Sequence, residues 1–354
     1  MLLQIKQFLR REAIFCLAVF LACASSLFQA PRLAYIDFDV LCVLLSLMLV
    51  VAGLKQVRFL DYVAVELLNR CVSRRQLTLA LVGITYVSSM FVTNDVALLT
   101  FVPLALVIGK TLQLDMERSI ILQTLAANLG SMLTPPGNPQ NLFLYAHYNY
   151  SAGRFFCVMA LPCLLSLAYI GVLIFRRLDA PLTLTLPGLP RPERRTTLVL
   201  LALLLVNIAA VLHVLPKLWA LGVTLAAVLL LNRRLLLAAD YSLLLTFIGF
   251  FIFIGNISHT SIAAYLQSSL LGTATGTYLA ALLSSQFISN VPAAMLLAGL
   301  TQEADALLLG VNIGGLGTMI ASMASVISYK LFVAEQPTLA GRYLRTFLYY
   351  NFAG

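Results

Sequence analysis

Long apolar runs recur along the whole chain of 354 residues, and they constrain its fold more than any other feature. A helix needs about 20 predominantly apolar residues to cross a bilayer. Only 10% of the residues are charged and 61% are hydrophobic, whereas soluble domains carry about 25% charged residues. The sequence therefore predicts an all-α polytopic membrane protein and excludes an ordinary soluble globule.

A polar segment at 179–196 divides these runs into two sets, and it contains four prolines and five charges. We expect a cytoplasmic linker here, between an N-terminal repeat (1–178) and a C-terminal repeat (197–354). The apolar runs of the first repeat are at about 13–30, 38–54, 76–109, 119–146 and 155–175. Those of the second repeat are at about 197–213, 218–232, 243–257, 273–300 and 306–328, followed by a short last helix from about residue 345.

Four of the runs are interrupted near their middle. Thr93-Asn94-Asp95 interrupts 76–109, and Ser289-Asn290-Val291 interrupts 273–300. A straight helix over either segment would be too long for the bilayer, so we expect each to be a re-entrant helical hairpin. The run at 119–146 contains TPPGNPQN, whose prolines cannot continue a helix, and 306–328 is rich in glycine and serine. Each repeat is therefore expected to contain a hairpin and then a discontinuous helix.

The basic residues indicate the orientation of these elements. With a cytoplasmic N-terminus and both hairpins folded back, 20 of the 23 Lys and Arg residues fall inside, and only Arg32, Arg154 and Lys217 fall outside. Cytoplasmic loops of membrane proteins carry such an excess. The bias predicts a multi-pass protein of the inner (plasma) membrane with two repeats related by inversion. It also explains the net charge of +9 without a nucleic-acid partner.

Helices that break inside a membrane expose backbone groups that can bind ions. The new N-terminal ends carry free N–H groups and favour an anion. The carbonyl ends, together with Asn and Thr oxygens, suit a hard cation such as Na⁺. Two such breaks close together predict a site for a small anion flanked by cations, as in many secondary transporters.

Four motifs carry a resemblance to a known family. TNDVALLTFVPL, GSMLTPPGNPQN, SNVPAAMLL and GVNIGGLGTMIAS occur in this order and resemble the ion transporter superfamily, which includes the divalent anion:sodium symporters and the arsenite permease (ArsB–NhaD) group. The likeness is strongest to its short YbiR-like anion permeases. The resemblance implies a scaffold domain, a mobile transport domain that holds both hairpins, a homodimer and elevator-type alternating access.

The resemblance also implies the residues of the site. The residues implied in substrate binding are Thr93, Asn94, Thr134, Ser289, Asn290 and Thr318. Those implied in binding the coupling cation, including Na⁺, are Asn94, Asp95, Gly137, Asn138, Asn290, Gly317 and Ser322. The symporter branch commonly has Ser-Asn-Thr at both tips, so Asp95 and Val291 depart from it and argue against a dicarboxylate.

The leading hypothesis is a secondary active transporter for a small anion, coupled to Na⁺ or H⁺, without any other cofactor. The alternatives are a Na⁺/H⁺ antiporter that uses Asp95 and an efflux permease for arsenite or another oxyanion. Asp95 could also serve as a helix cap, since Asp readily bonds nearby backbone N–H groups. No G-x-S-x-G or H-E-x-x-H motif lies in the apolar runs, so we expect no catalytic residues and no enzyme.

Overall fold

The computed structural model describes residues 12–176, 179–258 and 260–353, and all regular structure in these ranges is helical. The helices of the first half are α2 (Ala13–Ser26), α3 (Phe38–Gln56), α4 (Phe59–Leu68), α5 (Arg74–Val92), α6 (Asn94–Leu112), α7 (Glu117–Ser131), α8 (Pro139–His147) and α9 (Ala152–Phe175). Those of the second half are α10 (Arg194–Val211), α11 (Lys217–Asn232), α12 (Tyr241–Ile257), α13 (Ser261–Ser269), α14 (Ala274–Ile288), α15 (Asn290–Ala298), α16 (Ala304–Gly314), α17 (Met323–Glu335) and α18 (Ala340–Phe352).

Six of the described helical segments are long and apolar enough to cross a bilayer: α3, α5, α6, α9, α10, and α11 with the short 3-10 helix that follows it. The polytopic, all-helical membrane fold expected from the composition is therefore confirmed. The N-terminal residues 1–11, whose cytoplasmic location was expected, lie outside the described residues.

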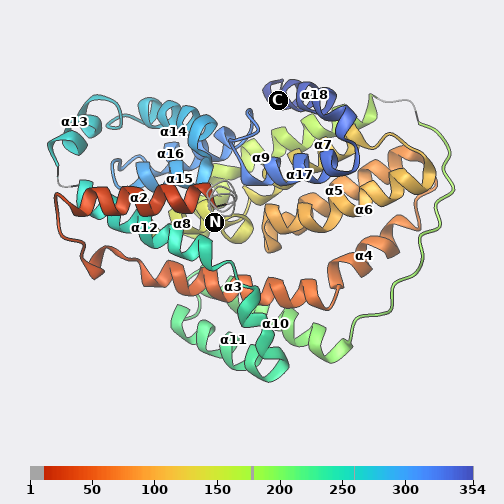
Figure 1. Cartoon of the computed structure of the whole chain (residues 1–354), viewed down its shortest axis with the longest axis horizontal. Coiled ribbons are helices and arrows are strands. Elements are labelled where there is room, and N and C mark those ends of the chain that lie inside the picture. Colours follow the sequence, from red (N-terminus) through yellow and green to blue (C-terminus); the bar gives the residue numbers. More distant parts are fainter. Residues whose placement is uncertain (1–11, 177–178, 259, 354) are drawn as a thin grey trace, which may run out of the picture.

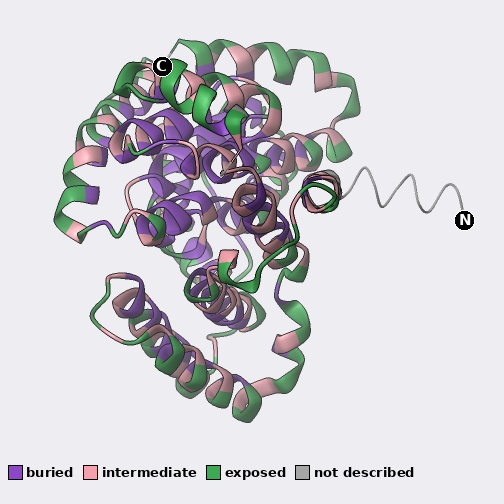
Figure 2. Ribbon diagram, turned by 90° about the vertical axis from the view of Figure 1, so that its left-hand side faces the viewer, coloured by how far each residue is buried: buried purple, intermediate pink, exposed green. Residues whose placement is uncertain are grey.

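The helices form two layers (Figure 1). In that view α3, α10 and α11 lie at the bottom, and the bundle of α5–α9 with α14–α18 lies at the top. Helices α2 and α12 pack against each other between the layers, and α12 also contacts α15. Figure 2 shows that the buried residues gather inside the larger bundle, whereas the outer faces of the helices are exposed. Exposed apolar faces of this kind are expected where a helix contacts lipid instead of water.

The ends of several helices differ from the expected boundaries. Helix α2 ends at Ser26 instead of about residue 30, and α17 continues to Glu335 instead of ending at 328. The last helix begins at Ala340 instead of about residue 345. Its first turn is charged and so lies outside any apolar run, but Tyr343 and Phe347, spaced four residues apart, are buried on one face.

Helix α18 is held on α7 by a charged contact. Arg342 forms ion pairs with Glu117 and, at 2.6 Å, with Asp115. Glu117 is only 3% exposed, and Thr346 Oγ1 donates to its second oxygen at 3.1 Å. The buried carboxylate therefore has partners on α18 for both of its oxygens.

The linker is an extended strap that runs along the right edge of Figure 1 to α10. Asp179 accepts hydrogen bonds from the Ser73 hydroxyl and the Arg75 N–H, both at 3.0 Å. Farther along, Leu186 N donates to Asn69 Oδ1 at 2.8 Å. The Arg75 N–H is the main cause of a lowered pKa at Asp179. The strap is thus fastened to the start of α5 and the end of α4.

Candidate functional site

A single residue separates the two helices of each hairpin. Thr93 lies between α5 and α6, with φ 73° and ψ 153°, and Ser289 lies between α14 and α15, with φ 74° and ψ 155°. This backbone conformation is occupied almost only by glycine, because a Cβ atom is strained there. Asn94 and Asn290 follow directly, begin the next helices and are buried. The two tips therefore share one unusual geometry.

The discontinuous helices break over 132–138 and 315–322. Asn138 caps α8, because its side chain accepts the Asn141 N–H at 3.0 Å. Gly137 is required at the first break, since an added Cβ would overlap the carbonyl of Ser131. Gly317 has φ 100° at the second break, where side chains other than hydrogen are strained. These local requirements explain why the helices stop here.

Each break is joined to its own hairpin by an equivalent hydrogen bond. Thr134 Oγ1 donates to the carbonyl of Met90 at 2.5 Å, and Thr318 Oγ1 donates to the carbonyl of Gln286 at 2.9 Å. Both carbonyls belong to the residue three positions before the tip. The two threonine hydroxyls therefore hold the breaks against α5 and α14.

The two discontinuous helices also contact each other through matching positions. Asn128 of α7 donates from Nδ2 to Ser325 Oγ of α17 at 3.3 Å. Asn312 of α16 donates from Nδ2 to Asn141 Oδ1 of α8 at 2.7 Å. Asn128 lies six residues before Thr134, and Asn312 lies six residues before Thr318. Asn141 is the third residue of α8, and Ser325 is the third residue of α17. The amide of α7 thus donates to α17, and the amide of α16 donates to the matching position of α8.

Asn128 also binds the first tip. Its Oδ1 accepts from Asn94 Nδ2 and from Ser322 Oγ, both at 3.0 Å. At the second tip, the Asn290 N–H donates to the carbonyl of Ala321 at 3.0 Å. A hydrogen-bonded network therefore connects both tips to both breaks.

A cavity of about 200 Å³ opens beside these contacts. The first residues of four helices line it: α6, α8, α15 and α17. The polar and charged lining residues are Glu12, Asn94, Asp95, Gln140, Asp240, Ser242, Thr246, Asn290, Ser322 and Lys330. Two buried atoms, Asp95 Oδ1 and Gln140 Nε2, have no hydrogen-bond partner among the described residues. One can accept a hydrogen bond or bind a cation, and the other can donate.

The expected site residues fall into two groups. Four line the cavity: Asn94, Asp95, Asn290 and Ser322. The others belong to the tips and breaks and do not line this cavity: Thr93, Thr134, Gly137, Asn138, Ser289, Gly317 and Thr318. Gly317 lines a separate cavity beside the break of α16. Sequence analysis missed Gln140, Asp240 and Lys330 as lining residues. The available sequence signal for Gln140 was its position directly after the proline of GNPQN, because this proline begins a helix inside an apolar run.

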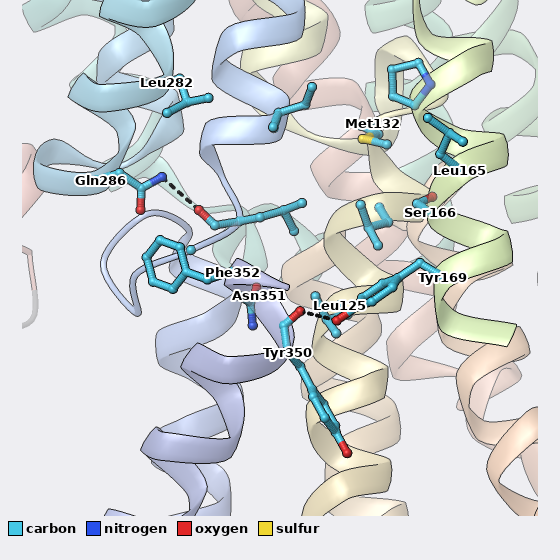
Figure 3. A pocket seen from close by; sticks show the side chains of 15 residues that line it. Leu125, Met132, Leu165, Ser166, Tyr169, Leu282, Gln286, Tyr350, Asn351 and Phe352 are labelled. Atoms are coloured by element: carbon cyan, nitrogen blue, oxygen red, sulfur yellow. Dashed lines mark hydrogen bonds between the residues drawn. The ribbon is translucent and has the colours of Figure 1, made fainter. Parts of the chain in front are cut away.

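A second cavity, of about 290 Å³, lies beside the break of α16 (Figure 3). Gln286 projects toward it and donates from Nε2 to the carbonyls of Gly314 and Leu316, at 2.7 and 2.8 Å. Tyr169 donates to the carbonyl of Tyr350 at 2.7 Å. The residues that line this second cavity include no Asp, Glu, Lys or Arg, so the first cavity is the better candidate for binding an ion.

Broken helices that meet at a cavity with polar lining residues, in a polytopic helical bundle, are the features of a membrane transporter. The sequence pattern of the citrate transporter family (CitMHS) matches residues 1–328, and the chain belongs to this family within the ion transporter superfamily. The family consists of transporters, not enzymes. The expected membership of the superfamily is confirmed.

Several relatives extend the comparison. The inner membrane protein YbiR of Escherichia coli (strain K12) is 31% identical over 313 residues, which cover 84% of this chain and 81% of the relative. The uncharacterized transporter MJ0456 of Methanocaldococcus jannaschii is 33% identical over 301 residues, with the same coverage of 84% and 81%. The human P protein is 29% identical over 114 residues, which cover 32% of this chain and 14% of the relative.

Proposed function

We propose that this chain is a secondary active transporter that moves a small anion across the plasma membrane by alternating access, coupled to Na⁺ or H⁺. The convergence of four helix N-termini on one cavity carries this proposal. Each N-terminus brings the positive end of a helix dipole to the cavity, which favours an anion. Membership of the citrate transporter family supports the same function.

The proposed architecture is a pair of inverted repeats, 1–178 and 197–354, joined by a cytoplasmic linker at 179–196. Each repeat has a re-entrant hairpin (α5–α6 or α14–α15) and a discontinuous helix (α7–α8 or α16–α17). The equal backbone geometry of Thr93 and Ser289 supports the pairing, as do the reciprocal amide contacts of Asn128 and Asn312. In Figure 1 the first hairpin extends to the right of the molecule and the second to the left, which supports inversion.

An elevator-type movement would carry the bundle of α5–α9 and α14–α18 past α3, α10 and α11. The separation of these helices into two layers in Figure 1 supports such a movement. The proposal includes a homodimer in the inner membrane with each N-terminus in the cytoplasm. The superfamily resemblance supports the homodimer, and the excess of basic residues in the expected cytoplasmic loops supports the orientation.

The proposed substrate-binding residues are Thr93, Asn94, Thr134, Ser289, Asn290 and Thr318. The proposed cation-binding residues are Asn94, Asp95, Gly137, Asn138, Asn290, Gly317 and Ser322. The unpartnered Oδ1 atom of Asp95 supports a coupling ion at this end of the cavity, because a buried oxygen without a hydrogen-bond partner is costly. The same oxygen favours the second candidate function, Na⁺/H⁺ antiport with Asp95 as the carrier.

Transport in proteoliposomes with imposed Na⁺ and pH gradients tests both functions. Labelled phosphate, sulfate, succinate, citrate and arsenite are offered to the wild type, to Asp95→Asn and to a control, Asp61→Asn, whose residue lies on α4 beside Arg58. We expect gradient-driven anion uptake that persists in Asp61→Asn and loses its ion dependence in Asp95→Asn. Na⁺-dependent proton movement that disappears in Asp95→Asn, without any anion flux, would instead establish the antiporter.

A further inference from the structure

Gln140 is a buried donor that the fold leaves unused. It is the second residue of α8, its side chain is 1% exposed, and it lines the cavity between the tips. Its Nε2 atom has no hydrogen-bond partner among the described residues. Most buried polar groups are paired, and an unpaired one costs stability. The position therefore favours a ligand that supplies the missing acceptor.

The second half of the chain does not repeat this side chain. The second residue of α17 is Ala324, and the residue that matches Asp95 at the other tip is Val291. The fold can therefore be built with an apolar residue at the matching position. Asp95 and Gln140 line the cavity from the first half, and the second half contributes Val291 and Met323 together with the polar residues Asn290 and Ser322. The two halves therefore present different side chains to a ligand in this cavity.

We propose that Gln140 Nε2 donates a hydrogen bond directly to an oxygen of the transported anion, and that Gln140 is a specificity-determining residue. This inference rests on the proposed function. The amide nitrogen donates only, so it recognises a deprotonated oxygen of a carboxylate or an inorganic oxyanion. Asp95, as an acceptor in the same cavity, is left to bind the coupling ion or a protonated group. Gln140 and Asp95 then contribute to anion and coupling ion from the first half, beside Asn290 and Ser322 of the second half.

Two substitutions at Gln140 and one control separate binding from structure. Gln140→Met keeps the approximate volume and removes the donor, and Gln140→Glu places a carboxylate against the anion. Gln123 is a matched control, because it is fully buried on α7 but hydrogen-bonds within the bundle, to Thr85 and to the carbonyl of Phe101, both at 3.3 Å. The control variant is Gln123→Met.

The measurements are the melting temperature of the purified protein, with and without each anion, and the KM for anion uptake in proteoliposomes. Gln140→Met is expected to melt at or above the wild-type temperature without ligand, since no hydrogen bond is lost. Its KM should rise about 10- to 100-fold, as expected for a lost hydrogen bond to a charged group, and Gln140→Glu should be worse. Gln123→Met should melt at a lower temperature and keep the wild-type KM.

The outcomes distinguish this inference from the proposed function. Anion uptake by the wild type with an unchanged KM in Gln140→Met overturns the role of Gln140 alone. A lower melting temperature of ligand-free Gln140→Met with an unchanged KM assigns the residue to the structure instead. If the wild type neither transports any anion of the panel nor is stabilised by one, the proposed function fails and this inference fails with it.

Discussion

Replacing the tip residues by glycine should stabilise the protein. Thr93 and Ser289 occupy a backbone region with positive φ that costs about 1–3 kcal/mol for a side chain other than hydrogen. Glycine removes this cost but loses about 0.5–1 kcal/mol through the greater freedom of the unfolded chain. We expect a net gain of about 0.5–2 kcal/mol for Thr93→Gly. The gain for Ser289→Gly should be smaller, because its hydroxyl contacts Ala321 O and Asn290 Oδ1 at 3.4 Å.

Thermal unfolding of the detergent-solubilised protein measures this effect. A gain of 1 kcal/mol shifts the melting temperature by about 2–4 °C in chains of about 150–250 residues and by less in a longer chain. A shift of about 1–4 °C is therefore expected for these 354 residues. Thr93→Ala and Ser289→Ala are the matched controls, because they remove the hydroxyl and keep the strained Cβ atom. Glycine variants no more stable than the alanine variants would refute the strain at the tips. Transport should fall in the glycine variants, since a relaxed tip no longer fixes Asn94 or Asn290.

Three further predictions concern packing, pH and the last helix. Gly130→Ala places a Cβ against the carbonyl of Tyr86 and should lower the free energy of unfolding by about 1–3 kcal/mol. Gly83→Ala has open space around it and should raise the free energy of unfolding by about 0.5–1 kcal/mol. Thermal unfolding of both variants measures the two effects. The pKa of Asp179 lies below its ordinary value of about 4, mainly through the N–H of Arg75, so its contribution to stability is present above that value and is lost as the pH falls through the lower folded-state pKa. Hydrogen exchange of the strap at 180–186 should accelerate over that acidic range, and Asp179→Asn should remove the pH step. Arg342→Gln leaves the buried carboxylate of Glu117 without its cation and should destabilise α18 by about 1–3 kcal/mol. The measurement is the protease sensitivity of the C-terminal helix, which should increase in this variant. Arg345→Gln, at an exposed position, is the control and should have little effect.

The helical membrane fold could be predicted from the sequence because apolar runs of bilayer length have few alternatives. The helix ends at Thr93 and Ser289 coincide with polar residues inside such runs, which a sequence displays directly. The presence of Gln140, Asp240 and Lys330 in the lining of one cavity could not be predicted in this way. These residues belong to three different helices, α8, the start of α12 and α17, and only the packing of those helices brings them to one cavity.

Helix α18 shows a second reason for incomplete prediction. Its buried face depends on a spacing of four residues, Tyr343 to Phe347, and on the contact of Arg342 with Glu117 more than two hundred residues away. An apolar-run criterion detects neither. Thr134 and Thr318 also hold the breaks against α5 and α14. This second role was hidden for a similar reason, since a hydroxyl that binds a distant carbonyl has the same sequence signature as one that binds a ligand.

The reciprocal contacts of Asn128 and Asn312 have an energetic consequence for the proposed inversion. A molecule whose halves can exchange roles has two arrangements that differ in free energy only through the residues that are not matched between the halves. Here these include Asp95 opposite Val291, and Gln140 opposite Ala324. A difference of about 1.4 kcal/mol already changes the ratio of two such populations tenfold. The unmatched side chains, and whatever binds to them, would therefore set which side of the membrane the cavity faces at rest.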